Sequence, residues 1–115
     1  MTKQQAKKPR APAHLRLATR HWWESVCSAY VLEEHHVRLL TLAAEAWDRA
    51  ADARDAMAKD GTYIPGRYRG SLHVHPAVRV ARQAALDFAR LLRELDLDTE
   101  PPPDPPRPPT PGRRH

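Results

Sequence analysis

Apolar residues recur every three or four positions along three separate stretches of this chain, a pattern typical of helices that each bury one side. The first stretch predicts a helix at about residues 18–29, whose apolar side carries Trp22, Trp23, Val26, Cys27 and Tyr30. Two adjacent tryptophans can stack on nucleic-acid bases, but their helical spacing with Val26 favours a place in the core. Cys27 lies on the same side without an activating neighbour, so we expect it to be inert.

The second stretch predicts a long helix at about residues 33–59 with two apolar sides. One side consists of Val37, Leu40, Ala44, Trp47 and Ala51. The other, named here the alanine stripe, consists of Leu39, Ala43, Ala46, Ala50, Ala53 and Met57. A surface helix of a monomer needs only one apolar side. We therefore expect the alanine stripe to form the interface of a homo-oligomer.

The same helix carries acidic residues one turn apart, at Asp48, Asp52 and Asp55. Carboxylates at this spacing can share a hard cation such as Ca²⁺. Basic residues are interspersed among them, however, which favours a solvated helix face over a metal site.

Residues 61–75 contain helix-breaking Pro and Gly between two short β-prone runs, which predicts a short β-hairpin or loop. His73 and His75 would point the same way in a strand, but no further ligand stands at a spacing typical of zinc sites. His35 and His36 are adjacent on a helix, so we expect their rings to diverge. The sequence predicts neither a metal site nor a cofactor.

The third stretch predicts a helix at about residues 76–96, with His75 as its cap and Pro76 at its first position. Its apolar seam is Val78, Ala81, Ala85, Phe88, Leu92 and Leu95. The fold class is therefore mainly α. We expect a basic flexible arm at residues 1–13, a helical domain for oligomerisation and DNA engagement at 14–98, and a Pro-rich tail at 99–115.

Size and composition agree with a small domain that oligomerises. The chain has 115 residues and a single cysteine, so an intrachain disulfide or a Cys-based zinc finger is excluded. A foldable part of about 85 residues is marginal alone, and small domains without cross-links often associate. No run approaches the roughly 18 apolar residues of a membrane span, and the basic N-terminus lacks the apolar segment of a signal peptide. We expect a cytosolic protein.

Charge is strongly segregated along the chain. Residues 1–23 carry six bases and no acid, residues 24–60 carry eight acids and four bases, and residues 61–86 again carry four bases and no acid. Such blocks favour a polyanionic partner, with a solubilising surface as the alternative. We expect double-stranded DNA to be held at its phosphates by Lys7, Lys8, Arg10, Arg67, Arg69, Arg79 and Arg82. Alternatively, Arg79 and Arg82 bind the acidic stripe of a neighbouring subunit, which consists of Asp48, Asp52 and Asp55.

Two segments carry a resemblance to a known family. They are "YVLEEHHVRLLTLAAEAWDRAADARDAMAKDG" and "HPAVRVARQAALDFARLLRELDLD". The Leu-Glu start, the Ala-Ala-Glu-Ala-Trp run, the Asp-Gly helix end and the His-Pro-Ala-Val-Arg opening resemble the small terminase subunit of tailed double-stranded-DNA phages. That pattern more often has Asn where His75 stands. The resemblance covers about residues 11–98 and leaves out the basic N-terminus and the Pro-rich tail.

The resemblance implies a non-catalytic DNA-recognition subunit. Members assemble into rings, engage viral DNA in the cytoplasm of the bacterial host, and regulate the large terminase subunit, which hydrolyses ATP and cuts DNA. This chain has no G-x-x-x-x-G-K-[ST] phosphate-binding loop, which agrees with such a role. Two other classes stay open from the residues alone: a small DNA-binding transcriptional regulator and a protein-only helical adaptor.

Overall fold

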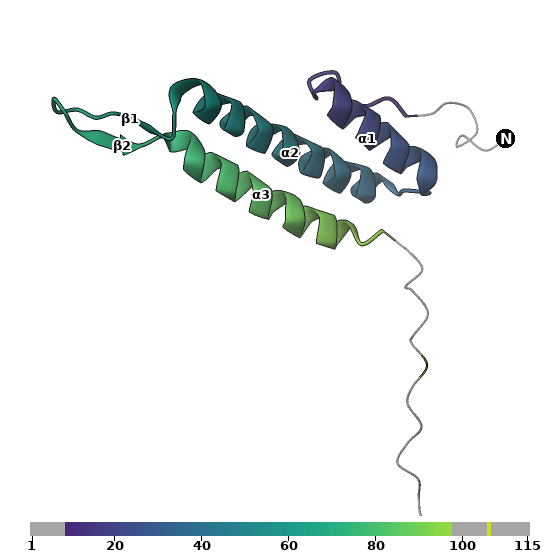
Figure 1. The fold of residues 1–115 in the computed structure, drawn as a ribbon. Helices are drawn as coiled ribbons and strands as arrows, with labels where there is room; N and C mark the ends of the chain where they lie inside the picture. The colour runs from purple at the N-terminus through teal and green to yellow at the C-terminus, as the bar shows by residue number, and fades with distance from the viewer. Residues whose placement is uncertain (1–8, 98–105, 107–115) are drawn as a thin grey trace, which may run out of the picture.

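The computed structural model of the chain describes residues 9–97 and Pro106, and it contains three helices and one two-stranded hairpin (Figure 1). The helices are α1 (Leu17–Ala29), α2 (Glu34–Asp60) and α3 (Pro76–Leu95), and the strands are β1 (Tyr63–Pro65) and β2 (Leu72–Val74). The predicted mainly helical class is confirmed, and every helix begins and ends within one residue of its predicted position.

Local residue types explain where the helices begin and end. α2 begins after Glu33, whose side chain accepts a hydrogen bond from the His36 N–H, while the His36 ring accepts one from the Glu33 N–H. It ends at Gly61, whose φ of 87° is one that L side chains rarely adopt. α3 begins with Pro76, and the His75 ring accepts a hydrogen bond from the Ala77 N–H at 2.9 Å. The predicted His75 cap is therefore confirmed.

α2 is the central helix, with α1 packed on one side and α3 running along the other (Figure 1). The core on the α1 side contains Leu40 and Ala44 of α2, together with Leu15, Trp23, Val26 and the last residue of α3, Leu95. Thr41 of α2 also accepts a hydrogen bond from the Trp23 indole at 3.2 Å. The predicted core position of the Trp23 ring is thus confirmed.

The alanine stripe lies within the single chain. Ala43, Ala46, Ala50 and Ala53 are at most 5% exposed, and Leu39 and Met57 at its two ends are half-buried. α3 supplies small buried residues of its own, Ala77 and Ala84, which let the two helices pack closely. The second apolar side of α2 therefore has a partner in the same chain, and the reasoning that it required a second subunit was wrong. In this fold Ala43, Ala46, Ala50 and Ala53 are not accessible to another copy, whereas Leu39 and Met57 stay partly exposed.

The hairpin joins α2 to α3 and projects beyond the end of both helices (Figure 1). β1 and β2 are antiparallel, with Tyr63 opposite Val74, Ile64 opposite His73 and Pro65 opposite Leu72. None of the helices within residues 9–97 combines the length and apolar character needed to cross a bilayer.

Candidate nucleic-acid interface

The base of the hairpin is fixed by His75, which bridges the end of α2 and the start of α3. Its Nδ1 accepts the Ala77 N–H at 2.9 Å, and its Nε2 lies 3.0 Å from an Asp60 carboxylate oxygen. Both contacts are satisfied when the ring proton is on Nε2, which then donates to Asp60. The His75 N–H also donates to the Thr62 carbonyl at 2.7 Å. These bonds fix the direction in which the hairpin leaves the helix pair.

Four of the predicted DNA-binding arginines lie on the hairpin and on the start of α3. Arg67 and Arg69 lie at the tip of the hairpin, and Arg79 and Arg82 lie in the first two turns of α3; all four are exposed. Within residues 9–97, no hydrogen bond or ion pair holds any of their guanidinium groups. Arg79 and Arg82 also line a groove of about 540 Å³ with Val74, His75, Pro76 and Val78. The structure thus places the four arginines at one end of the molecule, free to meet an anion.

The first turn of α3 already uses its own donors. Pro76 has no N–H, the Ala77 N–H is bonded to the His75 ring, and the Val78 N–H donates to the His75 carbonyl at 3.0 Å. Helix N-termini bind anions through free N–H groups. A phosphate at this end would therefore contact the arginine side chains more than the helix backbone.

Sequence reasoning missed Tyr68, whose side chain is 74% exposed between Arg67 and Arg69. The tip is a defined turn, in which the Ser71 N–H donates to the Tyr68 carbonyl at 3.0 Å. The Tyr68 N–H in return donates to the Ser71 hydroxyl at 3.2 Å. The Arg-Tyr-Arg run between two glycines could have indicated an exposed aromatic residue beside two charges.

The N-terminal part of the interface is only partly described. Arg10 is exposed, whereas Lys7 and Lys8 lie outside the described residues. The chain is tied to the helices soon after Arg10, because the Ala11 N–H donates to the Glu24 carboxylate at 3.1 Å and Leu15 is 3% exposed. An arm formed by these basic residues would therefore start from a fixed point beside α1.

The acidic stripe of α2 holds α1, which our sequence-based interpretation did not predict. Asp48 is buried, and its carboxylate accepts hydrogen bonds from the Arg16 N–H at 2.8 Å and the Thr19 hydroxyl at 2.6 Å. The Arg16 guanidinium pairs with Asp52 and Asp55, and its hydrogen bonds to Asp55 and Asp52 raise the pKa of Arg16 above its ordinary value. The prediction of a solvated helix face is correct for Asp52 and Asp55, which are exposed, and wrong for Asp48, which is buried.

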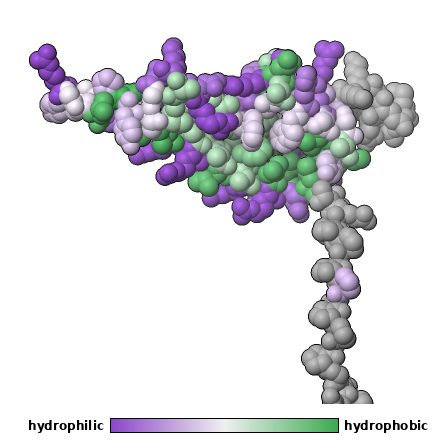
Figure 2. Space-filling model, viewed as in Figure 1, coloured by the Kyte–Doolittle hydropathy of each residue, from purple (hydrophilic) through white to green (hydrophobic). Residues whose placement is uncertain are grey.

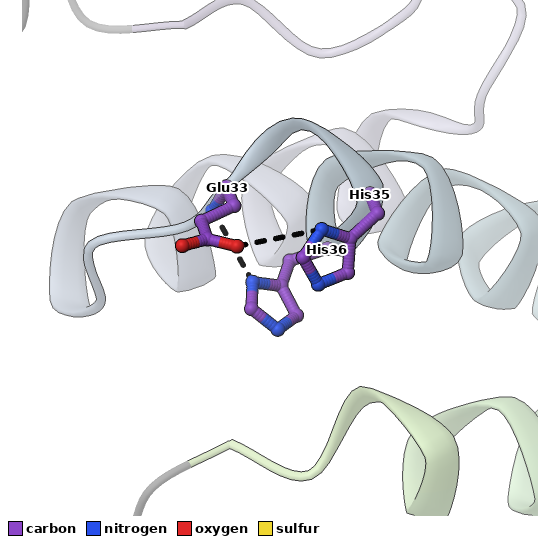
Figure 3. A group of neighbouring side chains, drawn as sticks. All are labelled: Glu33, His35 and His36. Atoms are coloured by element: carbon purple, nitrogen blue, oxygen red, sulfur yellow. Dashed lines mark hydrogen bonds and ion pairs between the residues drawn. The ribbon is translucent and has the colours of Figure 1, made fainter.

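His35 and His36 do not diverge as expected, since their ring centroids lie 4.1 Å apart (Figure 3). The His36 ring turns back to accept the Glu33 N–H at 3.2 Å, and His35 Nδ1 lies 3.5 Å from the Glu33 carboxylate. One ligand atom from each of the three residues lies within 4.8 Å of the others, as a metal site requires. Here the three groups satisfy one another at the start of α2, and this cap alone accounts for the arrangement.

One comparison with known proteins agrees with the resemblance. No curated protein and no solved structure matches the chain. A family model described as "Phage terminase, small subunit" matches residues 20–100, which include most of α1 and the whole of α2, the hairpin and α3. The match covers well over half of the chain, so this protein belongs to the phage terminase small subunit family.

Proposed function

We propose that this protein is the DNA-recognition and regulatory subunit of a viral genome-packaging motor. In this proposal it forms a ring-like homo-oligomer, engages double-stranded viral DNA, and regulates a large terminase subunit that supplies the ATPase and nuclease activities. The observation that carries the proposal is the group of four exposed arginines, Arg67, Arg69, Arg79 and Arg82, which has no acidic partner within the described part of the chain.

The arrangement of these arginines supports contacts to phosphate more than reading of bases. Two of them lie on a narrow hairpin tip and two on the side of a helix, and both pairs are long flexible side chains with free guanidinium groups. Phosphate contacts position a protein on DNA without carrying sequence information. In an oligomer every subunit repeats this set, so the assembly presents an extended basic surface to the DNA backbone.

The test is to replace Arg67, Arg69 and Arg79 together by Ala and to measure DNA affinity across a salt series by fluorescence anisotropy. Each lost phosphate contact lowers the log–log salt slope by about 0.9, so three lost contacts lower it by about 2.7 per subunit engaged. Affinity should fall to the same extent for unrelated DNA sequences.

A matched control variant loses the same amount of positive charge at three positions outside the proposed interface. Arg38, Arg49 and Arg54 lie on the acidic α2 segment, and Arg38 and Arg49 already pair with Glu34 and Asp87. Replacing these three by Ala should leave the salt slope nearly unchanged. If both triple variants lower the slope equally, net charge alone is responsible and the proposed interface is wrong.

The same triple variant also tests the alternative role of Arg79, in which this side chain binds a neighbouring subunit instead of DNA. In that case the triple change breaks up the oligomer, while each assembled particle that remains binds DNA normally. Measuring mass by light scattering on the samples used for anisotropy separates the two outcomes.

A further inference from the structure

The tip of the hairpin is a defined turn whose hydrogen bonds leave one aromatic side chain free. The Gly66 N–H donates to the Ser71 carbonyl at 2.9 Å, and the Ser71 N–H donates to the Tyr68 carbonyl at 3.0 Å. The Tyr68 N–H donates to the Ser71 hydroxyl at 3.2 Å. Gly70 adopts a φ of 80°, which L side chains rarely do. The turn thus uses only the backbone of Tyr68, and within residues 9–97 no hydrogen bond holds its phenol hydroxyl.

Tyr68 is 74% exposed, more than any other Tyr, Trp or Phe side chain of the chain. It lies between Arg67 and Arg69, and the glycines on either side of these three residues add no bulk to the tip. Figure 2 shows hydrophilic side chains at the tip of the projecting hairpin and apolar ones farther back. Tyrosine is enriched at interfaces because its ring is apolar and its hydroxyl polar. An exposed and fixed position at a loop tip is typical of a residue that contacts a partner.

The two neighbours of Tyr68 bring it to DNA if they bind phosphates. Consecutive Cα atoms are about 3.8 Å apart, so when Arg67 and Arg69 hold phosphates, Tyr68 lies within the same contact. Tyr68 is the uncharged one of the three residues, and an uncharged side chain releases no counterion from the DNA when it binds. It can therefore add affinity that does not depend on salt, unlike the phosphate contacts of the two arginines.

The dimensions of the hairpin fit the major groove of DNA better than the minor groove. Strands of three residues rise about 10 Å, and the tip extends beyond them. The major groove is about 12 Å wide and about 8.5 Å deep and admits a two-stranded ribbon, whereas the minor groove is about 6 Å wide. The hairpin also projects beyond the ends of α2 and α3, so its tip can enter a groove while both helices stay outside (Figure 1).

We propose that the tip of the hairpin enters the major groove and that the Tyr68 ring contacts the C5-methyl group of thymine there. This contact rests on the proposed function, in which Arg67 and Arg69 hold phosphates of the same DNA. The thymine methyl is the apolar group that base pairs present in the major groove, and apolar side chains contact it. Of the three side chains at the tip, only Tyr68 has an apolar surface without a charge. The two arginines thus position the hairpin, and Tyr68 determines a preference for thymine.

Two duplexes of the same sequence test this contact, one with thymidine and one with deoxyuridine, which lacks only the C5-methyl group. The affinity of the full-length protein for each duplex is measured by fluorescence anisotropy across a salt series. Burying one methyl group favours binding by about fourfold, so each engaged subunit should bind the thymidine duplex about fourfold more tightly. Tyr68→Ala should abolish this preference and leave the salt slope unchanged, because backbone bonds hold the turn.

Two further variants are the matched controls. Tyr68→Phe keeps the ring, so it should keep the preference for the thymidine duplex. Tyr63→Ala removes a tyrosine that is 62% exposed on β1, away from the tip, and should keep the preference as well. Both tyrosines are exposed, so none of the three replacements should disturb folding, which circular dichroism verifies.

A wild type that binds both duplexes equally overturns the inference, as does a preference that persists in Tyr68→Ala. Equal loss of affinity for both duplexes in Tyr68→Phe would assign the residue a hydroxyl contact to phosphate instead, and would overturn it too. A lower salt slope in Tyr68→Ala would mean that the side chain only places the arginines, which is again a different role. Each of these results leaves the proposed function standing. A wild type that binds neither duplex contradicts the proposed function itself, and the thymine contact with it.

Discussion

Replacing Asp48 tests how α1 is held on α2. The Asp48 carboxylate is 9% exposed and accepts two hydrogen bonds at the first turn of α1, from the Arg16 N–H and the Thr19 hydroxyl. Arg16 at the N-cap of α1 makes no capping bond with its own side chain, and Asp48 of α2 accepts the N–H of Arg16 itself, one of the first N–H groups that a helix leaves without a partner. Asp48→Ala leaves the Thr19 hydroxyl, in a residue that is 4% exposed, without a partner.

The expected cost follows from the burial of these groups. A hydrogen bond to a charged group contributes about 1.5–3 kcal/mol, and water can replace only the bond at the more exposed Arg16 N–H. We expect Asp48→Ala to lower the free energy of unfolding by about 3 kcal/mol. At a urea dependence of about 1 kcal/mol per molar, the unfolding midpoint would fall by about 3 M.

The control is Asp52→Ala, which removes an ion pair of the same Arg16 from a side chain that is 70% exposed. Exposed pairs contribute up to about 1 kcal/mol, so this change should lower stability much less. Urea unfolding is followed by circular dichroism at one fixed protein concentration, because oligomerisation makes stability depend on concentration. If the two variants unfold within about 0.5 kcal/mol of each other, which is the usual scatter of surface substitutions, Asp48 does not hold α1 as argued.

Further predictions concern the α3 cap, the cysteine and the tail. His75→Ala should cost about 1 kcal/mol in thermal unfolding, and His75→Asn clearly less because Asn can still cap the helix; equal losses would assign the effect to the Asp60 contact instead. Burial raises the pKa of the Cys27 thiol, which lowers its thiolate fraction at pH 8. Its reaction with a thiol reagent should therefore be slower in the folded chain than in urea, and equal rates would contradict this. Truncation after Glu100 should leave the oligomer intact and weaken stimulation of the large subunit's ATPase, whereas unchanged stimulation would reduce the tail to a spacer.

The sequence predicted the features that depend on neighbouring residues. Helix ranges follow from the 3.6-residue period, which is repeated several times in each helix. The ends of α2 and α3 follow from Gly61 and from the His75–Pro76 pair, whose effects on the backbone are local. The hairpin followed from the glycines and Pro65 that separate two β-prone runs.

Features that depend on distant residues could not be predicted in the same way. Asp48, Asp52 and Asp55 have equivalent helical spacing, and only the place where α1 crosses α2 decides that Asp48 is buried. The His35 and His36 rings approach each other because the His36 ring turns back to accept a hydrogen bond from the Glu33 N–H. Residue spacing does not reveal which side-chain rotamer is adopted. Exposure of the four arginines was consistent with their lack of acidic neighbours, but the groove that Arg79 and Arg82 line with His75 required the hairpin geometry.

The alanine stripe was correctly recognised as a second apolar side of α2, but the reasoning about what covers it was wrong. Two apolar sides on α2 do require two partners, and the chain has two other amphipathic helices to supply them. The 15 residues of hairpin and turns between α2 and α3 allow α3 to fold back along α2, and its Ala77 and Ala84 match the small residues of the stripe. Every element of the fold still exposes large apolar side chains, among them Leu17 on α1, Trp47 on α2, Leu86 on α3 and Leu72 on the hairpin. A contact between copies would therefore use side chains of this kind and not the four buried alanines of the stripe, which are at most 5% exposed because α3 covers them.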